Sequence, residues 1–210
     1  MEVGSPDNDL IHTYLGESWN KLAGETETHG HSSHPLIAQW RKALQDAGVS
    51  VKKFPPSIQA IAKRTQRVEA PFSVNPIVDT YNAVCMDLVI PGGAYDVDQL
   101  RGGLKLRVSE GGEAFTSIGV CEKSSTLLGE IVYSDDAEVI TRQFLWQQAE
   151  RGKILDSTRN VVFVFELLSG MGQDIIENAY QTIETRFSTL LGGEIKDLCV
   201  HRPPHKWIKR

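Results

Sequence analysis

The hydrophobic pattern of the chain changes its period about halfway along, and this change constrains the fold more than any other feature of the sequence. Up to about residue 90, apolar residues recur every three or four positions, as they do in amphipathic helices. From about residue 104 the pattern changes to short alternating or continuous apolar runs, which are typical of strands. Helices followed by strands predict an α+β domain rather than a series of βαβ units.

The first half of the chain is expected to hold a set of capped helices. The first has a capping sequence at residues 5–7, and a glycine ends each of the first two. Between these two helices, the polar stretch ETETHGHSSH predicts a loop, in which His34 helps to cap the second helix. The predicted helices span about residues 5–24, 35–48, 58–67 and 75–84.

The fourth helical segment, NPIVDTYNAV, carries a regular stripe of polar residues. Asn75 followed by Pro76 is typical of an N-cap with proline in the first turn, and Asp79 lies near the positive end of the helix dipole. Asn82 lies deeper and has no capping role. An asparagine buried without a partner costs about 1–3 kcal/mol, so Asn82 is the better candidate for a ligand contact.

The second half predicts strands and one long helix. Residues 104–108 alternate with period two, and the segments GEIVY and EVITRQF are expected to form a hairpin around the turn SDDA. The continuous apolar run NVVFVFELL predicts a strand that is buried on both faces. The expected strands span about residues 104–108, 114–120, 129–133, 138–144, 160–168 and 194–200, with an amphipathic helix from about Asp174 to Leu191.

Charge and cysteine content exclude several classes of protein. The chain of 210 residues has a formal net charge of −5, so a nucleic-acid partner has to meet a local basic patch rather than a global basic field. The chain contains Cys85, Cys121 and Cys199, which we expect to be buried reduced thiols in a reducing compartment. No apolar run is typical of a signal peptide or a membrane span, so a cytoplasmic protein is expected.

Five motifs occur in order along the chain: NPIVDTYNAV, IPGGAYDVDQL, LRVSEGGEAFTSIG, GEIVYSDDA and TRQFLWQQAERGKI. Together they resemble one known module, the tRNA-editing (B3/B4) domain of the phenylalanyl-tRNA synthetase beta subunit. The leading segments are similar to a freestanding branch of this family, and the resemblance covers roughly residues 34–200. It implies a three-layer α+β domain around a β-sandwich of unusual topology, with residues 1–33 as an added helix and polar loop and residues 34–210 as the editing-like domain.

The resemblance implies a function and several site residues. In the synthetase this module hydrolyses tyrosine wrongly attached to the phenylalanine tRNA, with neither a metal or other cofactor nor a covalent nucleophile. Asn82 matches the family's pocket asparagine, whereas Tyr81 stands in place of the threonine before it. Gly93 stands in place of the family's pocket histidine. Glu150 aligns with the glutamate that recognises the tyrosine hydroxyl.

The chain is therefore expected to be a trans-acting aminoacyl-tRNA deacylase. The alternative is a non-catalytic module that binds tRNA or an amino-acid-like small molecule, which the loss of the histidine and threonine favours. Glu150 and Arg142, in a polar cluster around Trp146, are expected to fix the amino acid. The carbonyl and the attacking water are expected to contact Asn82, Thr116 and the backbone amides near Gly92 and Gly93.

The C-terminal sequence HRPPHKWIKR is a candidate for contacts with tRNA. It carries four positive charges and no acidic residue, in a chain that is otherwise acidic. An aromatic residue among these charges is suited to stack on an unpaired base. The predicted tRNA-binding residues are Arg202, Lys206, Trp207, Lys209 and Arg210. The competing interpretation is an ordinary basic terminus whose Trp207 packs on the domain.

Overall fold

The computed structural model describes residues 1–144 and 146–200, and it shows an α+β fold with the helices leading, as the change of hydrophobic period predicted. Four helices precede the first strand, and a fifth follows the last one. The helices are α1 (Asn8–His29), α2 (Pro35–Asp46), α3 (Ser57–Thr65), α4 (Pro76–Leu88) and α5 (Gln173–Leu191).

The strands form three small antiparallel sheets. β1 (Gly92–Asp96) pairs with β8 (Val161–Phe165), so Gly93 lies opposite Val164. A four-stranded sheet has the order β2-β5-β6-β7, and β3 pairs only with β4. The strands of these two sheets are β2 (Lys105–Val108), β3 (Ala114–Phe115), β4 (Ser124–Ser125), β5 (Ile131–Ser134), β6 (Val139–Arg142) and β7 (Gln147–Gln148).

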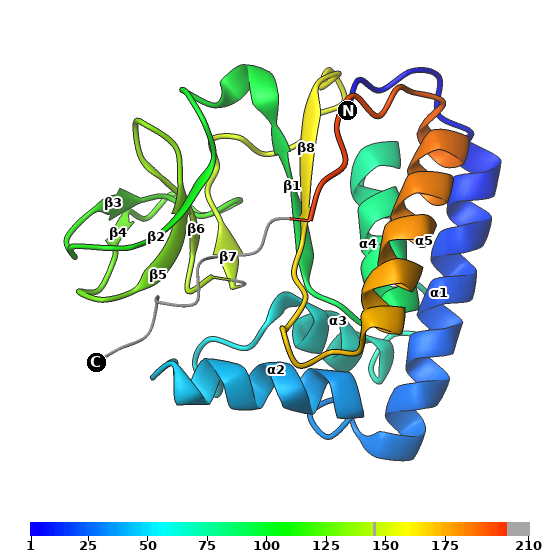
Figure 1. Ribbon diagram of the computed structural model, residues 1–210, viewed down its shortest axis with the longest axis horizontal. Coiled ribbons are helices and arrows are strands. Elements are labelled where there is room, and N and C mark those ends of the chain that lie inside the picture. Colours follow the sequence, from blue (N-terminus) through cyan, green and yellow to red (C-terminus); the bar gives the residue numbers. More distant parts are fainter. Residues whose placement is uncertain (145, 201–210) are drawn as a thin grey trace.

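The β1–β8 ribbon lies between a layer of helices and a lobe of short strands (Figure 1). Helices α1, α4 and α5 pack against one another on one side of the ribbon, and strands β2 to β7 lie on the other. The main hydrophobic core fills the helical layer: Trp19 and Leu22 of α1 share it with Phe187 of α5. Phe163 of β8 packs edge to face on Phe187 with ring centroids 4.3 Å apart, which joins the ribbon to the helices.

The first helix is longer than its sequence pattern predicted. Asp7 caps it, because its carboxylate accepts a hydrogen bond from the backbone N–H of Leu10 at 3.0 Å. Gly24 does not end the helix, which continues to His29. The hydroxyl of Thr26, which is fully buried, lies 3.3 Å from that of Thr65 at the end of α3. Tertiary packing therefore outweighs the poor helix propensity of glycine.

Several other local predictions were wrong. Residues 114–120 contain only the two-residue strand β3, and residues 194–200 contain no strand beyond a bridge from Glu194 to Glu2. Strand β8 is half-buried along most of its length rather than covered on both faces, because only the helical core, which Phe163 and Phe165 contact, packs closely on it. His34 occupies the N-cap of α2, but its imidazole contacts the carboxylate of Glu25 at 3.0 Å instead of capping the helix.

The cysteines also differ from expectation. Cys85 is buried, but Cys121 and Cys199 are exposed to solvent. Their apolar neighbours in sequence do not fold over them, since residues 119–125 and 195–200 lie mostly at the surface. All three are free thiols.

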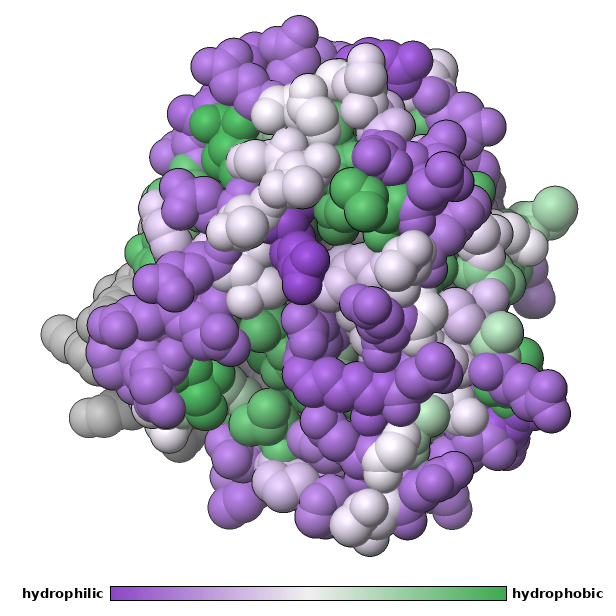
Figure 2. Space-filling model, turned by 90° about the vertical axis from the view of Figure 1, so that its right-hand side faces the viewer, coloured by the Kyte–Doolittle hydropathy of each residue, from purple (hydrophilic) through white to green (hydrophobic). Residues whose placement is uncertain are grey.

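The outer face of the helical layer is largely hydrophilic. Figure 2 shows this face, on which hydrophobic residues form small separate areas rather than one broad patch. Among residues 1–144 and 146–200, none of the helices has the length and apolar character needed to cross a lipid bilayer.

Candidate functional site

A small cavity of about 150 Å³ opens where α4, the β1–β8 ribbon and the β6–β7 turn meet. Its walls are largely aromatic, and its polar groups are hydroxyls, two side-chain amides and one carboxylate. Neither lysine, arginine nor histidine is among the described residues that line it. The lining residues are Ser57, Tyr81, Gly92, Gly93, Tyr95, Tyr133, Thr141, Phe144, Trp146, Gln147, Gln148, Val164 and Glu166.

The start of α4 is fixed by two side chains that the sequence singled out. The amide oxygen of Asn75 accepts a hydrogen bond from the N–H of Val78 at 2.9 Å, as expected of an N-cap. The buried carboxylate of Asp79 accepts from the N–H of Val74 at 2.9 Å and from the hydroxyl of Ser73. These bonds hold the first turn of α4 and so set where Tyr81 enters the cavity.

Strand β1 needs its two glycines for different reasons. A side-chain carbon on Gly92 would lie 2.8 Å from both the thiol sulfur of Cys85 and the ring of Phe165, closer than packed atoms approach. At Gly93 the nearest atom would be the hydroxyl oxygen of Tyr95 at 3.7 Å, which is an ordinary contact. Because neighbouring residues of a strand face opposite sides, Gly92 faces α4 and Gly93 faces the cavity.

The β6–β7 turn is held by a buried ion pair. The guanidinium of Arg142 donates two hydrogen bonds to the carboxylate of Glu130, at 2.8 and 2.7 Å, and both side chains are almost fully buried. The same carboxylate accepts from the N–H of Gln143 at 3.0 Å and from that of Leu127 at 2.8 Å. Gln143 and Phe144 are held in the left-handed region, at φ 49° and 63°. Such backbone strain is typical of functional sites, and here it directs the Phe144 ring into the cavity.

The one carboxylate among the described residues that line the cavity belongs to Glu166, which follows β8. The hydroxyl of Tyr133 donates a hydrogen bond to its Oε1 atom, and the backbone N–H of Glu166 donates to the carbonyl oxygen of Pro91 at 2.9 Å. Burial raises the pKa of Glu166 to about 7. Beside it, the hydroxyls of Tyr95 and Thr141 are hydrogen-bonded at 2.7 Å.

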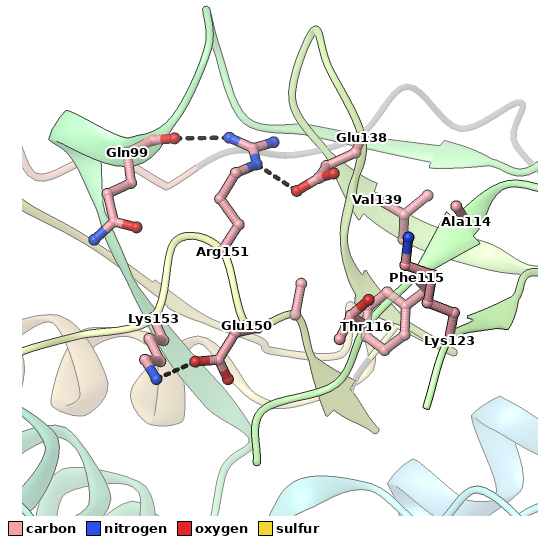
Figure 3. A pocket seen from close by; sticks show the side chains of 11 residues that line it. Gln99, Ala114, Phe115, Thr116, Lys123, Glu138, Val139, Glu150, Arg151 and Lys153 are labelled. Atoms are coloured by element: carbon pink, nitrogen blue, oxygen red, sulfur yellow. Dashed lines mark hydrogen bonds and ion pairs between the residues drawn. The ribbon is translucent and has the colours of Figure 1, made fainter. Parts of the chain in front are cut away.

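A second, larger cavity of about 600 Å³ lies on another part of the β lobe (Figure 3). Arg151 reaches toward Glu138 and also contacts Asp135 at 2.8 Å, while Lys153 reaches toward Glu150. Lys153 and the backbone N–H of Gly119 lower the pKa of Glu150. The strands and loops of the β lobe supply the remaining lining, which includes Ala114, Phe115, Thr116, Lys123, Val139 and Ala149.

The residues predicted for the site do not lie together: some line the small cavity, some line the larger cavity and others line neither. Gly92, Gly93 and Trp146 line the small cavity, whereas Thr116 and Glu150 line the larger one. The β6–β7 segment contributes to both cavities, so they are neighbours along the chain. The guanidinium of Arg142 is occupied by Glu130 and lines neither of them, and half-buried Asn82 lines neither. Residues 201–210, which carry the predicted tRNA contacts, lie outside the described residues.

Sequence reasoning missed the carboxylate and two of the tyrosines of the small cavity. Glu166 interrupts the apolar run NVVFVFELL, and a charged residue in a strand expected to be buried was the available signal. Tyr133 falls within a strand pattern that fits an ordinary core equally well, and Tyr95 lies in β1, for which no strand was predicted. Their convergence depends on the pairing of β1 with β8 and of β5 with β6.

Comparison with known protein families identifies the domain to which most of the chain corresponds. The family model described as the B3/4 domain matches residues 39–185, which is more than half of the chain. The matched range begins inside α2, ends inside α5 and contains all the residues that line either cavity. No curated protein matches the chain.

Proposed function

The chain belongs to the B3/4 domain family, the domain found in the phenylalanyl-tRNA synthetase beta subunit, and from this premise we propose that it hydrolyses aminoacyl-tRNA esters in trans. The aminoacyl group enters the small cavity, and water attacks its ester carbonyl. The products are free amino acid and uncharged tRNA.

One observation carries this proposal: three separate motifs of the sequence, one of them about 40 residues beyond the other two, converge on the small cavity. Tyr81 comes from the segment 75–84, Gly92 and Gly93 from the segment 90–100, and Trp146 from the segment 141–154. These are the segments in which the sequence resembles the editing domain. A binding site built from them is therefore the natural place for the family's ligand.

The cavity has the size and the lining that suit an amino-acid side chain. A cavity of about 150 Å³ is large enough for a group of roughly benzene size. The rings of Tyr81, Phe144 and Trp146 offer apolar contact, while Thr141 and Gln148 supply a few polar atoms. Most small-molecule sites combine apolar walls with a small number of polar groups in this way.

Hydrolysis by this site requires positioning rather than a covalent nucleophile. Cys85 lies next to Gly92, but burial raises the pKa of its thiol, which disfavours the reactive thiolate. Backbone groups of Gly92 and Gly93 are close enough to the cavity to orient the ester and a water molecule. Thr116 and Glu150, at the larger cavity, are proposed to contact the part of the ligand beyond the aminoacyl group.

A panel of aminoacylated tRNAs tests the proposal directly. Each tRNA carries a different labelled amino acid, and release of the free amino acid is measured with the full chain. We expect release above the spontaneous rate for a subset of the amino acids. Spontaneous rates across the whole panel would contradict catalysis.

A non-catalytic binding module is the second candidate, and the cavity lining favours it in one respect. Tyr81 and Gly93 stand where the editing domain has a threonine and a histidine, so two polar side chains of the family pocket are replaced. In this case the protein binds the same aminoacylated tRNAs and protects their ester bond from spontaneous hydrolysis. Saturable binding without turnover identifies this function.

A further inference from the structure

We infer that Glu166 is the group that receives the α-ammonium of the aminoacyl ligand in the small cavity, with its Oε2 atom facing the ligand. This inference rests on the proposed function for the choice of ligand. It assigns a specificity role to a residue outside the motifs that resemble the editing domain. It also assigns this role to a different carboxylate from Glu150.

The first argument is the environment of the carboxylate. Tyr133 donates to Oε1 of Glu166, and no hydrogen bond to Oε2 is found among the described residues. A half-buried carboxylate oxygen that lines a cavity needs a partner from the ligand or from water. An ammonium group supplies both a hydrogen-bond donor and the opposite charge.

The second argument is the ring of aromatic side chains. Tyr81, Tyr95, Phe144 and Trp146 line the same cavity as Glu166. Aromatic faces attract cations through the negative charge above the ring, and the attraction is strongest where water is excluded. A carboxylate surrounded by aromatic rings is the arrangement that proteins use to hold amines.

The third argument is the absence of a cation from the described lining of the cavity. A free amino acid brings a carboxylate, and this cavity offers neither lysine nor arginine nor histidine to pair with it. An aminoacyl ester keeps the ammonium but has lost the carboxylate. The site is thus complementary to the esterified amino acid and disfavours the product of hydrolysis.

Burial adds a measurable consequence. Because the pKa of Glu166 is raised to about 7, most of the carboxyl is protonated at pH 6 when the cavity is empty. The titratable groups that face it are the phenols of Tyr81, Tyr95 and Tyr133, and the thiol of Cys85 lies behind β1. Binding of an ammonium then releases a proton from Glu166.

The test uses amino-acid amides, which mimic the ester and are stable in water. L-Phenylalaninamide and L-alaninamide are titrated into the full chain, and each is compared with its N-acetyl derivative and with the free amino acid. We expect each amide to bind at least about tenfold more tightly than either comparison compound. Calorimetry at pH 6 in two buffers of different ionisation enthalpy is expected to show release of close to one proton.

The matched variants are Glu166→Gln and Glu184→Gln. Glutamine keeps the shape of the side chain and an acceptor for Tyr133, so we expect Glu166→Gln to abolish the preference for the amine and the proton release. Glu184 is an exposed carboxylate on α5, and its loss is expected to change neither measurement. Equal binding of amide and N-acetyl amide, failure of the amides to bind, or an unchanged preference in Glu166→Gln would each overturn the inference.

These measurements contain no tRNA, so the outcome is separable from that of the deacylation assay. Amine-dependent binding without hydrolysis supports the inference and contradicts the proposed catalysis. Hydrolysis of aminoacyl-tRNA without a preference for the free amine supports the proposed catalysis and contradicts the inference about Glu166. A Glu166→Gln variant that loses turnover but keeps the amine preference would make Glu166 an acid–base group and would also overturn the inference.

Discussion

At the scale of single residues, two neighbouring glycines make the small cavity possible in different ways. Gly92 lets β1 approach α4, since a side-chain carbon there would meet Cys85 and Phe165 at 2.8 Å. Gly93 leaves space on the cavity side, where a side-chain carbon meets nothing closer than 3.7 Å. Substitution of each glycine by alanine therefore tests separately the role of Gly92 in packing and the role of Gly93 in ligand binding.

We predict that Gly93→Ala folds with nearly wild-type stability but loses ligand affinity, because its methyl group occupies part of a cavity of only about 150 Å³. Gly92→Ala is expected to lower the free energy of unfolding by about 1–3 kcal/mol through overpacking. Urea unfolding and amide binding measured on both variants check this. Destabilisation by Gly93→Ala as large as that by Gly92→Ala would show that both glycines serve packing.

Glu166 is also predicted to make stability depend on pH. Its pKa rises from the usual 4.5 to about 7 on folding, so the folded protein binds this proton more tightly than the unfolded chain. The stabilising contribution is present below about pH 4.5 and is lost as the pH rises to 7. Glutamine does not titrate, so Glu166→Gln does not lose stability in this way. Between pH 4.5 and pH 7.5, its free energy of unfolding relative to wild type should rise by about 1–3 kcal/mol, after allowance for the partial exposure of Glu166.

The measurement is the free energy of unfolding in urea for both proteins at several values of pH. Comparison with Glu184→Gln controls for the general effect of removing one negative charge. A difference between wild type and Glu166→Gln that stays constant with pH would show that the carboxyl is not shifted by burial.

At the scale of elements, the β6–β7 turn depends on the Glu130–Arg142 pair. Both side chains are almost fully buried, and the carboxylate accepts four hydrogen bonds that also fix the backbone at Gln143 and Leu127. We predict that Arg142→Met lowers the free energy of unfolding by about 3–5 kcal/mol, because it leaves the buried carboxylate without its charge partner.

The exposed Lys42–Asp46 pair on α2 offers the matched control, since its 2.7 Å contact joins two solvent-exposed side chains. Lys42→Met is expected to change stability by less than about 0.5 kcal/mol. Thermal or urea unfolding of the two variants compares the loss of a buried ion pair, in Arg142→Met, with the loss of an exposed one, in Lys42→Met. A cost for Arg142→Met no greater than for Lys42→Met would mean that the turn is held by other contacts.

The elements also show how far the sequence alone predicts this fold. Helices α2, α4 and α5 and the β5–β6 hairpin were predicted, because caps, glycines and hydrophobic period are local signals. Residues 194–200 have the alternation of a strand but find no partner strand in the described structure, where only Glu194 bridges to Glu2. Strand formation depends on distant pairing, which local pattern does not carry.

The candidate site was predictable to a similar extent. The order of the motifs that contain Gly92, Gly93 and Trp146 pointed to the small cavity through the family resemblance. Arg142 shared that polar context, yet its partner is Glu130, twelve residues earlier. Glu166 was hidden in an apolar run, because only the antiparallel pairing of β8 with β1 brings it against Pro91, next to Gly92. Which charged residues pair, and which residues of different strands meet in one cavity, depend on tertiary structure and could not be predicted from the sequence alone.

At the scale of the whole molecule, charge is distributed unevenly between residues 1–200 and residues 201–210. Residues 201–210 contain four positive charges and no acidic residue, so removing them from the total of −5 leaves −9 for residues 1–200. An acidic body repels the phosphates of tRNA. A tRNA ligand then depends on a local group of cations, and the C-terminal sequence is the densest one in the chain.

We predict that deleting residues 203–210 weakens tRNA binding and reduces its dependence on salt, without changing which aminoacyl group is preferred. The deletion removes Lys206, Lys209 and Arg210, and each phosphate contact to a single strand contributes about 0.7 to the slope of log affinity against log salt concentration. The slope should therefore fall by up to about 2.

A variant with these three residues changed to glutamine keeps Trp207 and so distinguishes the contribution of charge from that of base stacking. If stacking contributes, this variant keeps some affinity for tRNA, and salt hardly alters that affinity. Binding of a labelled tRNA at several salt concentrations measures both quantities, and equal affinity with equal slope for the truncated and full-length chains would refute a nucleic-acid role for these residues.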